Sequence, residues 1–320
     1  MLVYTEARPG LLKASCVALG FFDGVHPGHQ AVIKKAVDEA RRLDIASGVV
    51  TFYDHPRGLT RGQAPQLLTV IEQRLDLFEA LGVDHAMVLT FSEELCRLSP
   101  REYVENVLLG SMGAKSISVG HNHHFGRNRE GDANLLRQYG QEDDFVVHVA
   151  DMVFVDGLEV SSSRIRQLIE QKDMPLAASL LSRPYAVRGT IVGGAQRGRK
   201  IGFPTANVSA AFNQLIPPPG VYAGYIRQAK DGPSLLQPMP CVINIGYRPT
   251  FSEEVKQNKE NPLTVEAHVL DFEGDLYDQT LEVQFVQYLR GEIKFEGIKQ
   301  LVDQIASDCQ SARCYLAACT

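Results

Sequence analysis

Residues 19–30 constrain the fold of this chain more than any other stretch. The apolar run before them, residues 16–19, predicts a buried strand, and residues 31–42 after them carry apolar side chains at helical spacing. The stretch itself contains three glycines and two histidines, His26 and His29. Histidines three positions apart lie on one face of a helix, so both open the predicted helix on the same side. The sequence therefore predicts a strand, a glycine-rich turn and a helix in succession.

A turn of this kind can bind phosphate groups. The start of a helix offers unpaired N–H groups and the positive end of the helix dipole. Gly24 and Gly28 allow a phosphate chain to approach the backbone. The stretch lacks the G-K-[ST] of a Walker A loop and the G-x-G-x-x-G of a dinucleotide fingerprint. We therefore expect a nucleoside-triphosphate site in which two imidazoles face negative charge; a metal pair or a coincidence is the alternative.

Residues 20–30, G-F-F-D-G-V-H-P-G-H-Q, resemble the G-x-F-D-G-x-H-x-G-H signature of nucleotidylyltransferases. More closely, they resemble the start of the bacterial bifunctional riboflavin kinase/FAD synthetase family, which usually has Asn where this chain has Phe21. The resemblance implies that His26 and His29 are catalytic. It also implies that nucleotide or substrate is bound by the other matched positions of the motif, Gly20, Phe21, Asp23, Gly24 and Gly28.

Composition and charge narrow the class of protein. A chain of 320 residues can form two domains with separate cores, and 44% hydrophobic with 22% charged residues excludes a disordered chain. The formal net charge of -6 argues against a nucleic-acid partner. The first residues lack the pattern of a signal peptide, and no run of about 18 apolar residues could cross a membrane. We expect a cytoplasmic protein that acts on small molecules, and the sequence is compatible with a homo-oligomer.

The six cysteines lie far apart or five positions apart, without a C-x-x-C pair. This spacing does not fit a zinc site, and disulfides are not expected in the cytoplasm. Cys309, Cys314 and Cys319 are expected to be packed or surface thiols on a helix near the C-terminus.

The first half of the chain alternates between strand and helix patterns. Strands are expected at 46–52, 85–90 and 115–119, and helices at 70–81 and from Ser99, where S-P-R-E reads as a capping box. Alternation predicts a parallel sheet with helices on both faces, a Rossmann-like fold whose ligands lie beyond the carboxyl ends of the strands. His55, after the first of these strands, and the segment 120–126 should therefore open on the same crevice as the His26 turn. His55 matches a T-F-x-x-H-P turn of the resembled family.

Two further segments of this half carry the resemblance. Residues 120–126 contain three histidines, which cannot all point in one direction from a strand or turn, so a metal site is not expected. The segment resembles the V-G-x-[DN]-F-x-F-G turn of the family, with Asn122 at the nucleotide- or flavin-binding position. His123 stands where the family has Phe. Residues 161–166 suit phosphate, because short hydroxyls and guanidinium groups open a helix, and they resemble I-S-S-T-x-I-R. The resemblance implies binding by Ser161, Ser162 and Ser163 and catalysis by Arg166.

After Pro184 the pattern changes from helical to period two. Strands are expected at 185–192, 221–226, 240–245, 264–270 and 281–289, followed by a helix over 296–316. Clustered short strands predict a small antiparallel barrel with a helix packed on it. We place the domain boundary between 183 and 184, giving domains 1–183 and 184–320.

The second half contains a glycine-rich basic stretch, residues 193–207, that ends in F-P-T-A-N. On its own it could be a flexible basic hairpin, but it resembles the G-x-P-T-A-N motif of riboflavin kinases, in which Thr and Asn bind magnesium. Thr205 and Asn207 are two positions apart, so they face one side of an extended segment, and oxygen ligands suit Mg²⁺. The resemblance implies that Glu266 is the general base, although a glutamate on a wet strand face is the alternative. It further implies nucleotide or substrate binding by Gly194, Arg197, Gly202, Pro204 and Arg248. Asp278-Gln279 departs from the Gly-Lys usual in the family.

Taken together, the resemblance implies a transferase that phosphorylates riboflavin to FMN with ATP and Mg²⁺, and then joins FMN to the AMP part of ATP to give FAD and pyrophosphate. Two alternatives remain open. The departures at Phe21 and His123 could leave a riboflavin kinase with an impaired first half. The chain could also be a flavin-binding sensor or carrier without catalysis.

Overall fold

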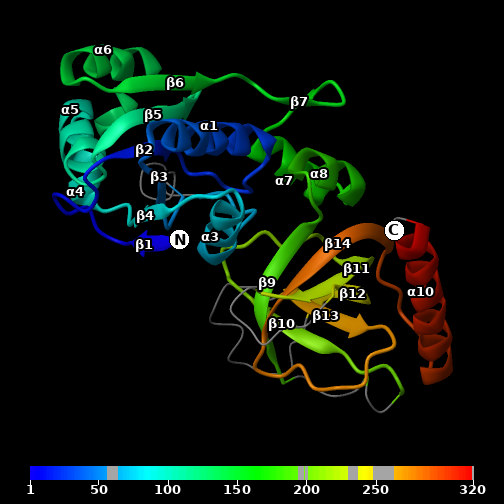
Figure 1. Cartoon of the computed structure of the whole chain (residues 1–320). Coiled ribbons are helices and arrows are strands. Elements are labelled where there is room, and N and C mark those ends of the chain that lie inside the picture. The colour runs from blue at the N-terminus through cyan, green and yellow to red at the C-terminus, as the bar shows by residue number, and fades with distance from the viewer. Residues whose placement is uncertain (56–63, 194–197, 199–200, 230–236, 248–262, 319–320) are drawn as a thin grey trace. The chain divides into compact units, whose positions relative to one another are not determined.

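The computed structural model describes residues 1–55, 64–193, 198, 201–229, 237–247 and 263–318. The chain divides into two compact units, Met1–Ser162 and Ser163–Thr320, which are coloured from blue to green and from green to red in Figure 1. The division falls at the start of the helix α7 (Ser162–Glu170). The boundary between 183 and 184 that the change of periodicity suggests stays a prediction.

The first unit is built on a parallel sheet of six strands, which confirms the predicted architecture. The order across the sheet is β1-β4-β3-β2-β5-β6, and every neighbouring pair is parallel. The strands are β1 (Leu2–Tyr4), β2 (Ser15–Leu19), β3 (Ala46–Phe52), β4 (His85–Leu89), β5 (Ala114–Gly120) and β6 (Val146–Ala150). Of these, β1 and β6 escaped sequence prediction. A short hairpin of β7 (Phe154–Val155) and β8 (Leu158–Glu159) follows.

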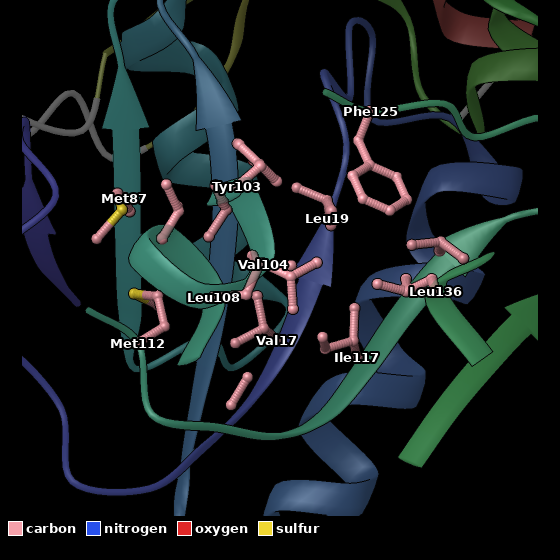
Figure 2. Close-up of a cluster of buried hydrophobic side chains, with 14 of the residues drawn as sticks. Val17, Leu19, Met87, Tyr103, Val104, Leu108, Met112, Ile117, Phe125 and Leu136 are labelled. Carbon is pink, nitrogen blue, oxygen red and sulfur yellow. The ribbon is translucent and has the colours of Figure 1, made fainter. Parts of the chain in front are cut away.

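Two apolar cores cover the two faces of this sheet. Cys16 and Ala18 of β2 face α1 (Pro27–Leu43) and Phe78 of α3 (Ile71–Ala80). Val17 and Leu19 face the opposite side, where the core includes residues from the π-helical turn η1 (Val104–Leu109); Figure 2 shows this cluster. The remaining helices of the unit are α4 (Glu93–Arg97), α5 (Pro100–Tyr103), the 3-10 turn η2 (Arg127–Arg129) and α6 (Ala133–Asp143). Because both faces of β2 are buried, its sequence is uniformly apolar after Ser15.

Two helix ends of the first unit lie where the nearby residues predict them. Ser99 caps α5: its hydroxyl accepts from the Glu102 N–H, and its own N–H donates to the Glu102 carboxylate at 2.8 Å. Gly82, with φ +86°, follows α3 and adopts the left-handed conformation that glycine favours.

The strand order fixes where the site of a parallel sheet can lie. The chain runs from β2 to β3 and β4 on one side, and then returns to place β5 on the other side of β2. The topological switch point is therefore between β2 and β5, and ligands of such sheets bind beyond the carboxyl ends of the strands there. β2 leads into the turn with His26, and β5 leads into the segment with Asn122.

The second unit is a closed antiparallel barrel, as predicted. Its order is β10-β13-β12-β11-β14-β9. The strands are β9 (Tyr185–Val192), β10 (Ala206–Ala210), β11 (Gly220–Gln228), β12 (Met239–Tyr247), β13 (Leu263–Val269) and β14 (Thr280–Arg290). Side chains of alternate residues fill the interior, among them Val187, Tyr222 and Phe285, all fully buried. β9 has the predicted bounds and β13 is shifted by one residue, whereas β11, β12 and β14 extend one or two residues beyond the predicted ends. β10 was not recognised as a strand of its own.

Two helices precede the barrel and one packs on its outside. α7 (Ser162–Glu170) and α8 (Met174–Leu181) come first, and α8 contacts β9 and β14. α10 (Ile298–Ala318) covers the outer face of β11 and β12 through Cys309, Ala312 and Leu316. Cys309 is buried and Cys314 exposed, as expected for thiols on a helix, whereas Cys319 lies outside the described residues. None of the helices in the described ranges is long and apolar enough to cross a membrane.

A buried ion pair ties α10 to the barrel. Asp308 accepts from Nε and Nη2 of Arg290 at 2.8 and 2.6 Å, and from Gln304 at 2.9 Å. Asp308 is buried, so removing it leaves a guanidinium without its counter-charge.

We predict that Asp308→Ala destabilises the second unit by about 3 kcal/mol, because breaking one partner of a buried pair strands the other charge. Urea unfolding followed by circular dichroism measures the change. Asp271→Ala is the matched control, since its pair with Arg313 on the same helix is exposed and should contribute little. Equal effects of the two substitutions would contradict this account of α10.

Candidate active sites

The turn between β2 and α1 carries both predicted catalytic histidines. His26 is the N-cap of α1, Pro27 occupies the first helical position, and Nδ1 of His26 accepts a hydrogen bond from the His29 N–H at 3.4 Å. The two rings stack, with centroids 3.6 Å apart and planes 20° apart. His26 is buried and His29 half-buried. The predicted placement on one face is therefore what the structure shows.

This geometry fits a phosphate ligand. A neutral imidazole that accepts at Nδ1 carries its hydrogen on Nε2, which makes Nε2 of His26 a donor. The N–H groups and the dipole of the first turn of α1 add positive potential at the same place. Gly28 contributes by its small size: a Cβ there would lie 3.2 Å from the His26 ring.

The backbone of the turn is held in uncommon conformations. Phe22, Gly24 and Val25 all have positive φ, at 56°, 84° and 41°. Glycine adopts such a φ without strain, whereas a β-branched valine rarely does. Gly20 leaves room for the ring of Phe22, which a Cβ would approach to 2.8 Å. Surrounding contacts must therefore fix this turn.

Asp23 supplies one of these contacts. Its carboxylate is buried and accepts hydrogen bonds from the N–H groups of Leu68 and Thr69, at 3.0 and 2.9 Å. The Thr69 hydroxyl accepts from the N–H of Gly24 at 2.8 Å, and the Ser162 hydroxyl donates to the carbonyl of Asp23 at 2.9 Å. The structure thus gives Asp23 an anchoring role in the turn, and its predicted contact with nucleotide stays a prediction.

Arg74 on α3 supplies a second contact that fixes the turn, and the sequence analysis did not predict it. Its guanidinium is fully buried and donates to the carbonyls of Phe21 and Phe52, both at 2.9 Å. The guanidinium carbon also lies 4.5 Å from the centre of the Phe21 ring, which meets the His55 ring edge-on at 4.8 Å. Burial lowers the pKa of Arg74 to about 10, against the attraction of Asp23, so the side chain is charged at neutral pH. His55 is therefore placed beside the turn, through Phe21.

The segment after β5 does not bring its three histidines together. His121 and His124 are exposed, whereas His123 is partly buried and stacks on Phe125 with ring centroids 6.0 Å apart. Burial lowers the pKa of His123 to about 4, with a smaller effect of nearby positive charge. Nε2 of His123 has no hydrogen-bond partner within the described ranges. Asn122 is exposed, and its role stays a prediction.

The serine–arginine segment spans the division between the two units. Ser161 and Ser162 belong to the first unit and are half-buried. Ser163 and Arg166 belong to α7 in the second unit. The bond from Ser162 to Asp23 lies within the first unit, and the catalytic role of Arg166 stays a prediction.

The outer face of the barrel brings the predicted kinase residues together. Asn207 of β10 pairs directly with Glu266 of β13, and Glu266 pairs directly with Asn244 of β12. Directly opposed residues project from the same face of a sheet. Ala206, Val208, Val265 and Ala267, which alternate with them, are buried inside. Asn207 and Glu266 are half-buried, so this polar row lies open to a ligand.

His268 fixes the segment before β10. Its Nδ1 lies 2.7 Å from the carbonyl of Pro204, and its ring meets Phe203 edge-on at 5.3 Å. Thr205, just after Pro204, is half-buried, and Gly202 turns the chain with φ +89°. Asn244 and His268 were not predicted as site residues. His268 lies two positions after Glu266 on β13, so the period-two alternation of a strand could have pointed to it, whereas Asn244 joins the row only through the pairing of β12 with β13, which the sequence does not show.

Several predicted positions remain to be placed. Gly194, Arg197 and Arg248 lie outside the described residues.

Asp278, where the sequence departs from the resembled family, has φ +61°, and its N–H donates to the carbonyl of Ile191. The resembled family has glycine at this left-handed position, which Asp tolerates better than most residues. The departure at Asp278 therefore fits a loop conformation.

Comparisons with known proteins cover nearly the whole chain. A family model for FAD synthetase matches residues 9–164, and one for riboflavin kinase matches residues 181–316. A bifunctional riboflavin kinase/FMN adenylyltransferase from Pseudomonas fluorescens is 38% identical over 304 residues, 94% of this chain and 93% of the relative. The enzyme of that name from Bacillus subtilis is 34% identical, covering 95% of this chain and 93% of the relative. A crystal structure described as a macrolide-efflux protein from Streptococcus pneumoniae is 28% identical with a TM-score of 0.84, over 98% of this chain and 99% of its own.

We predict that His123→Phe removes part of the acid sensitivity of the first unit. The folded pKa near 4 lies below the ordinary value of 6.5, so the folded protein binds fewer protons than the unfolded chain between these pH values. The stability that neutral His123 contributes is present above pH 6.5 and falls as the pH drops towards 4. Unfolding free energies from pH 4 to pH 8 should fall less steeply in the variant than in the wild type. His121→Phe, at an exposed position, is the control and should keep the wild-type slope.

Proposed function

The chain belongs to the family of bifunctional riboflavin kinase/FMN adenylyltransferases, and from this premise we propose that it makes FAD from riboflavin in two ATP-dependent steps. The chain is a transferase with a FAD synthetase half and a riboflavin kinase half. The observation that carries the proposal is the pairing of His26 and His29 at the start of α1, at the switch point of the parallel sheet. The polar row through Glu266 on the barrel supports the kinase step.

In the kinase step, Glu266 takes the proton of the 5′-hydroxyl of riboflavin while that oxygen bonds to the γ-phosphorus of ATP. The bond to the β-phosphate oxygen breaks, and FMN and ADP leave. Such a transfer depends on positioning and on compensation of charge. Glu266 lies beside Asn207 on a half-buried face, so its carboxylate can meet both a ligand and the reacting hydroxyl.

Thr205 and Asn207 fit a magnesium ion. Their hydroxyl and carboxamide oxygens belong to the oxygen donors that Mg²⁺ prefers, and Mg²⁺ keeps several waters besides. We propose that both residues hold Mg²⁺ bound to ATP. The ion would supply positive charge against the phosphate oxygens.

In the adenylyl step, a phosphate oxygen of FMN bonds to the α-phosphorus of ATP, and the bond to the β-phosphate side breaks to release pyrophosphate. No covalent bond to the protein is needed. The Nε2–H donor of His26, the ring of His29 and the start of α1 stabilise the charge that develops on the phosphate oxygens. Arg166 is proposed to add a guanidinium, and Asn122 and His55 to contact nucleotide or flavin.

A riboflavin kinase with an impaired first half is the second candidate, favoured by Phe21 and His123 at positions where the family has Asn and Phe. Both side chains are accommodated: Phe21 packs on Arg74, and His123 stacks on Phe125. We further propose a cytoplasmic location, because both steps consume ATP.

Purified protein incubated with Mg-ATP and riboflavin, with the products separated by chromatography, distinguishes the two candidates. The two-site enzyme gives FMN and then FAD, whereas the impaired enzyme gives FMN alone. Bound flavin without either product would contradict both.

We predict that His29→Ala lowers FAD formation from FMN about 100-fold, the usual effect of removing one stabilising group from a transition state. FMN formation from riboflavin should stay at the wild-type rate, because it takes place on the barrel. Chromatographic rates for each step measure this split. Lys115→Ala, at an exposed position at the amino end of β5 in the same unit, is the control and should leave both rates unchanged.

We predict the reverse for Glu266→Gln. Loss of the general base should lower FMN formation about 100- to 10,000-fold, while FAD formation from added FMN is retained. The carboxamide keeps the size of the side chain, and Glu273→Gln on an exposed loop is the matched control. If either His29→Ala or Glu266→Gln removed both activities from a folded protein, the two sites would not be independent.

A further inference from the structure

Arg74 occupies the place where the hydrogen-bonded ladder between β2 and β3 ends. The last ladder contact there is the Gly20 N–H to the carbonyl of Val50 at 3.1 Å. Beyond this point, β2 turns towards α1 and β3 runs on towards His55, so their next carbonyl groups face no N–H of the other strand. Buried carbonyl groups need donors.

The guanidinium of Arg74 provides those donors. Its Nη1 donates to the carbonyls of Phe21 and Phe52, each at 2.9 Å. Its Nη2 donates to the carbonyl of Tyr53 at 3.0 Å. The hydroxyl of Thr51 joins the same group, donating to the Phe21 carbonyl at 2.9 Å and lying 3.3 Å from Nη1. One side chain thus bonds to the ends of two strands that both lead into the candidate site.

The guanidinium also orders the ring that follows β2. Its carbon lies over the Phe21 ring, 4.5 Å from the ring centre, as a cation does on an aromatic face. The same ring also meets the His55 ring edge-on, with centroids 4.8 Å apart. His55 therefore depends on Arg74 twice, through Phe21 and through the carbonyl of Tyr53, two residues before it.

Arg74 is costly to bury, which argues that its geometry matters. The side chain is fully buried, and each hydrogen bond named above goes to a neutral oxygen and not to a carboxylate. A buried charge without a bonded counter-charge is unfavourable. Asp23 in the same turn acts on it at longer range. A planar fork with several fixed donors is what three separate carbonyls require, and a lysine offers no such fork.

We propose that Arg74 is a positioning residue for adenylyl transfer: it holds the carboxyl ends of β2 and β3 in the arrangement that presents the His26–His29 pair and His55 to the nucleotide. The proposal rests on the adenylyl transfer proposed above. Arg74 does not touch substrate, because its Nη1 and Nη2 bond to backbone carbonyls inside the protein and the side chain is fully covered.

Three variants test this role. Arg74→Met keeps the length of the side chain and removes all donors, and Arg74→Lys keeps the charge and removes the fork. Arg101→Met is the matched control, because Arg101 also bonds to several partners of the same unit, namely Glu105, Glu142 and Asp143, on another part of its surface. For each variant, the kcat and KM of FAD formation, the rate of FMN formation and the thermal unfolding temperature are measured.

We expect kcat for FAD formation to fall about 100-fold in Arg74→Met and about tenfold in Arg74→Lys, since small displacements of reacting groups have effects of this size. The KM for ATP should change much less than kcat, and FMN formation should match the wild type. Millimolar guanidinium should restore part of the lost rate in Arg74→Met. In Arg101→Met, FAD formation should stay within about twofold, whatever its unfolding temperature.

A readout without turnover completes the test. The imidazole proton resonances of His26, His29 and His55 should shift in both Arg74 variants and stay in place in Arg101→Met. Unshifted resonances with an unchanged kcat in Arg74→Met would overturn the proposal, as would equal losses of kcat in the Arg74 and Arg101 variants. If Arg74→Met does not fold, the folded Arg74→Lys decides by the same criteria. A wild-type protein that forms no FAD would instead refute the proposed function, and the resonances alone would then decide on positioning.

Discussion

Polar groups that are buried at the end of a strand must find partners inside the protein, and this constraint shapes the first unit. β2 is covered on both faces, and the chain has to leave it within a few residues to start α1. The turn accomplishes this with left-handed backbone at Phe22, Gly24 and Val25. It keeps that shape because the Asp23 carboxylate bonds to the 68–69 backbone and the Arg74 guanidinium bonds to the carbonyls of both strand ends. The stacked pair of His26 and His29 depends on both anchors, since it stands on the backbone that they fix.

In the second unit, the polar backbone groups of the strands find their partners in another way. Closing six antiparallel strands into a barrel leaves no free edge, and the interior is filled by side chains from alternate positions. The opposite positions are then available for function. α10 covers one part of the outer surface with Cys309 and Ala312, while the row of Asn207, Glu266 and Asn244 on neighbouring strands remains polar. The same alternation that builds the core therefore presents the predicted base beside a predicted magnesium ligand.

Features that depend on nearby residues could be predicted from the sequence. The capping box at Ser99, the glycine after α3 and the strand–turn–helix around His26 all arise from contacts within a few positions, and the structure has them. The parallel sheet and the antiparallel barrel follow from periodicity in the same way. The short edge strands β1 and β6 gave too weak a pattern, and β10 was hidden in a segment read as a motif.

Features that depend on distant residues could not be predicted. Arg74 contacts Phe21 from 53 positions away, and His268 contacts Pro204 from 64 positions away. Asn244 joins the Glu266 row only through the register of β12 and β13. A sequence motif identifies residues that are expected to contact the ligand. The side chains that hold those residues in place come from distant parts of the chain and are known only from the fold.

The central claim is that one chain performs two chemically different attacks on ATP, at the γ-phosphorus on the barrel and at the α-phosphorus on the parallel sheet. It is tested most directly by incubating the protein with riboflavin and with ATP labelled by ³²P at the α position and ³³P at the γ position. The account predicts FMN with the γ label alone, FAD with both labels, and pyrophosphate with the γ label. FMN that carries the γ label with no labelled FAD would contradict the claim for the parallel-sheet unit, and flavin without either label would contradict it for the whole chain.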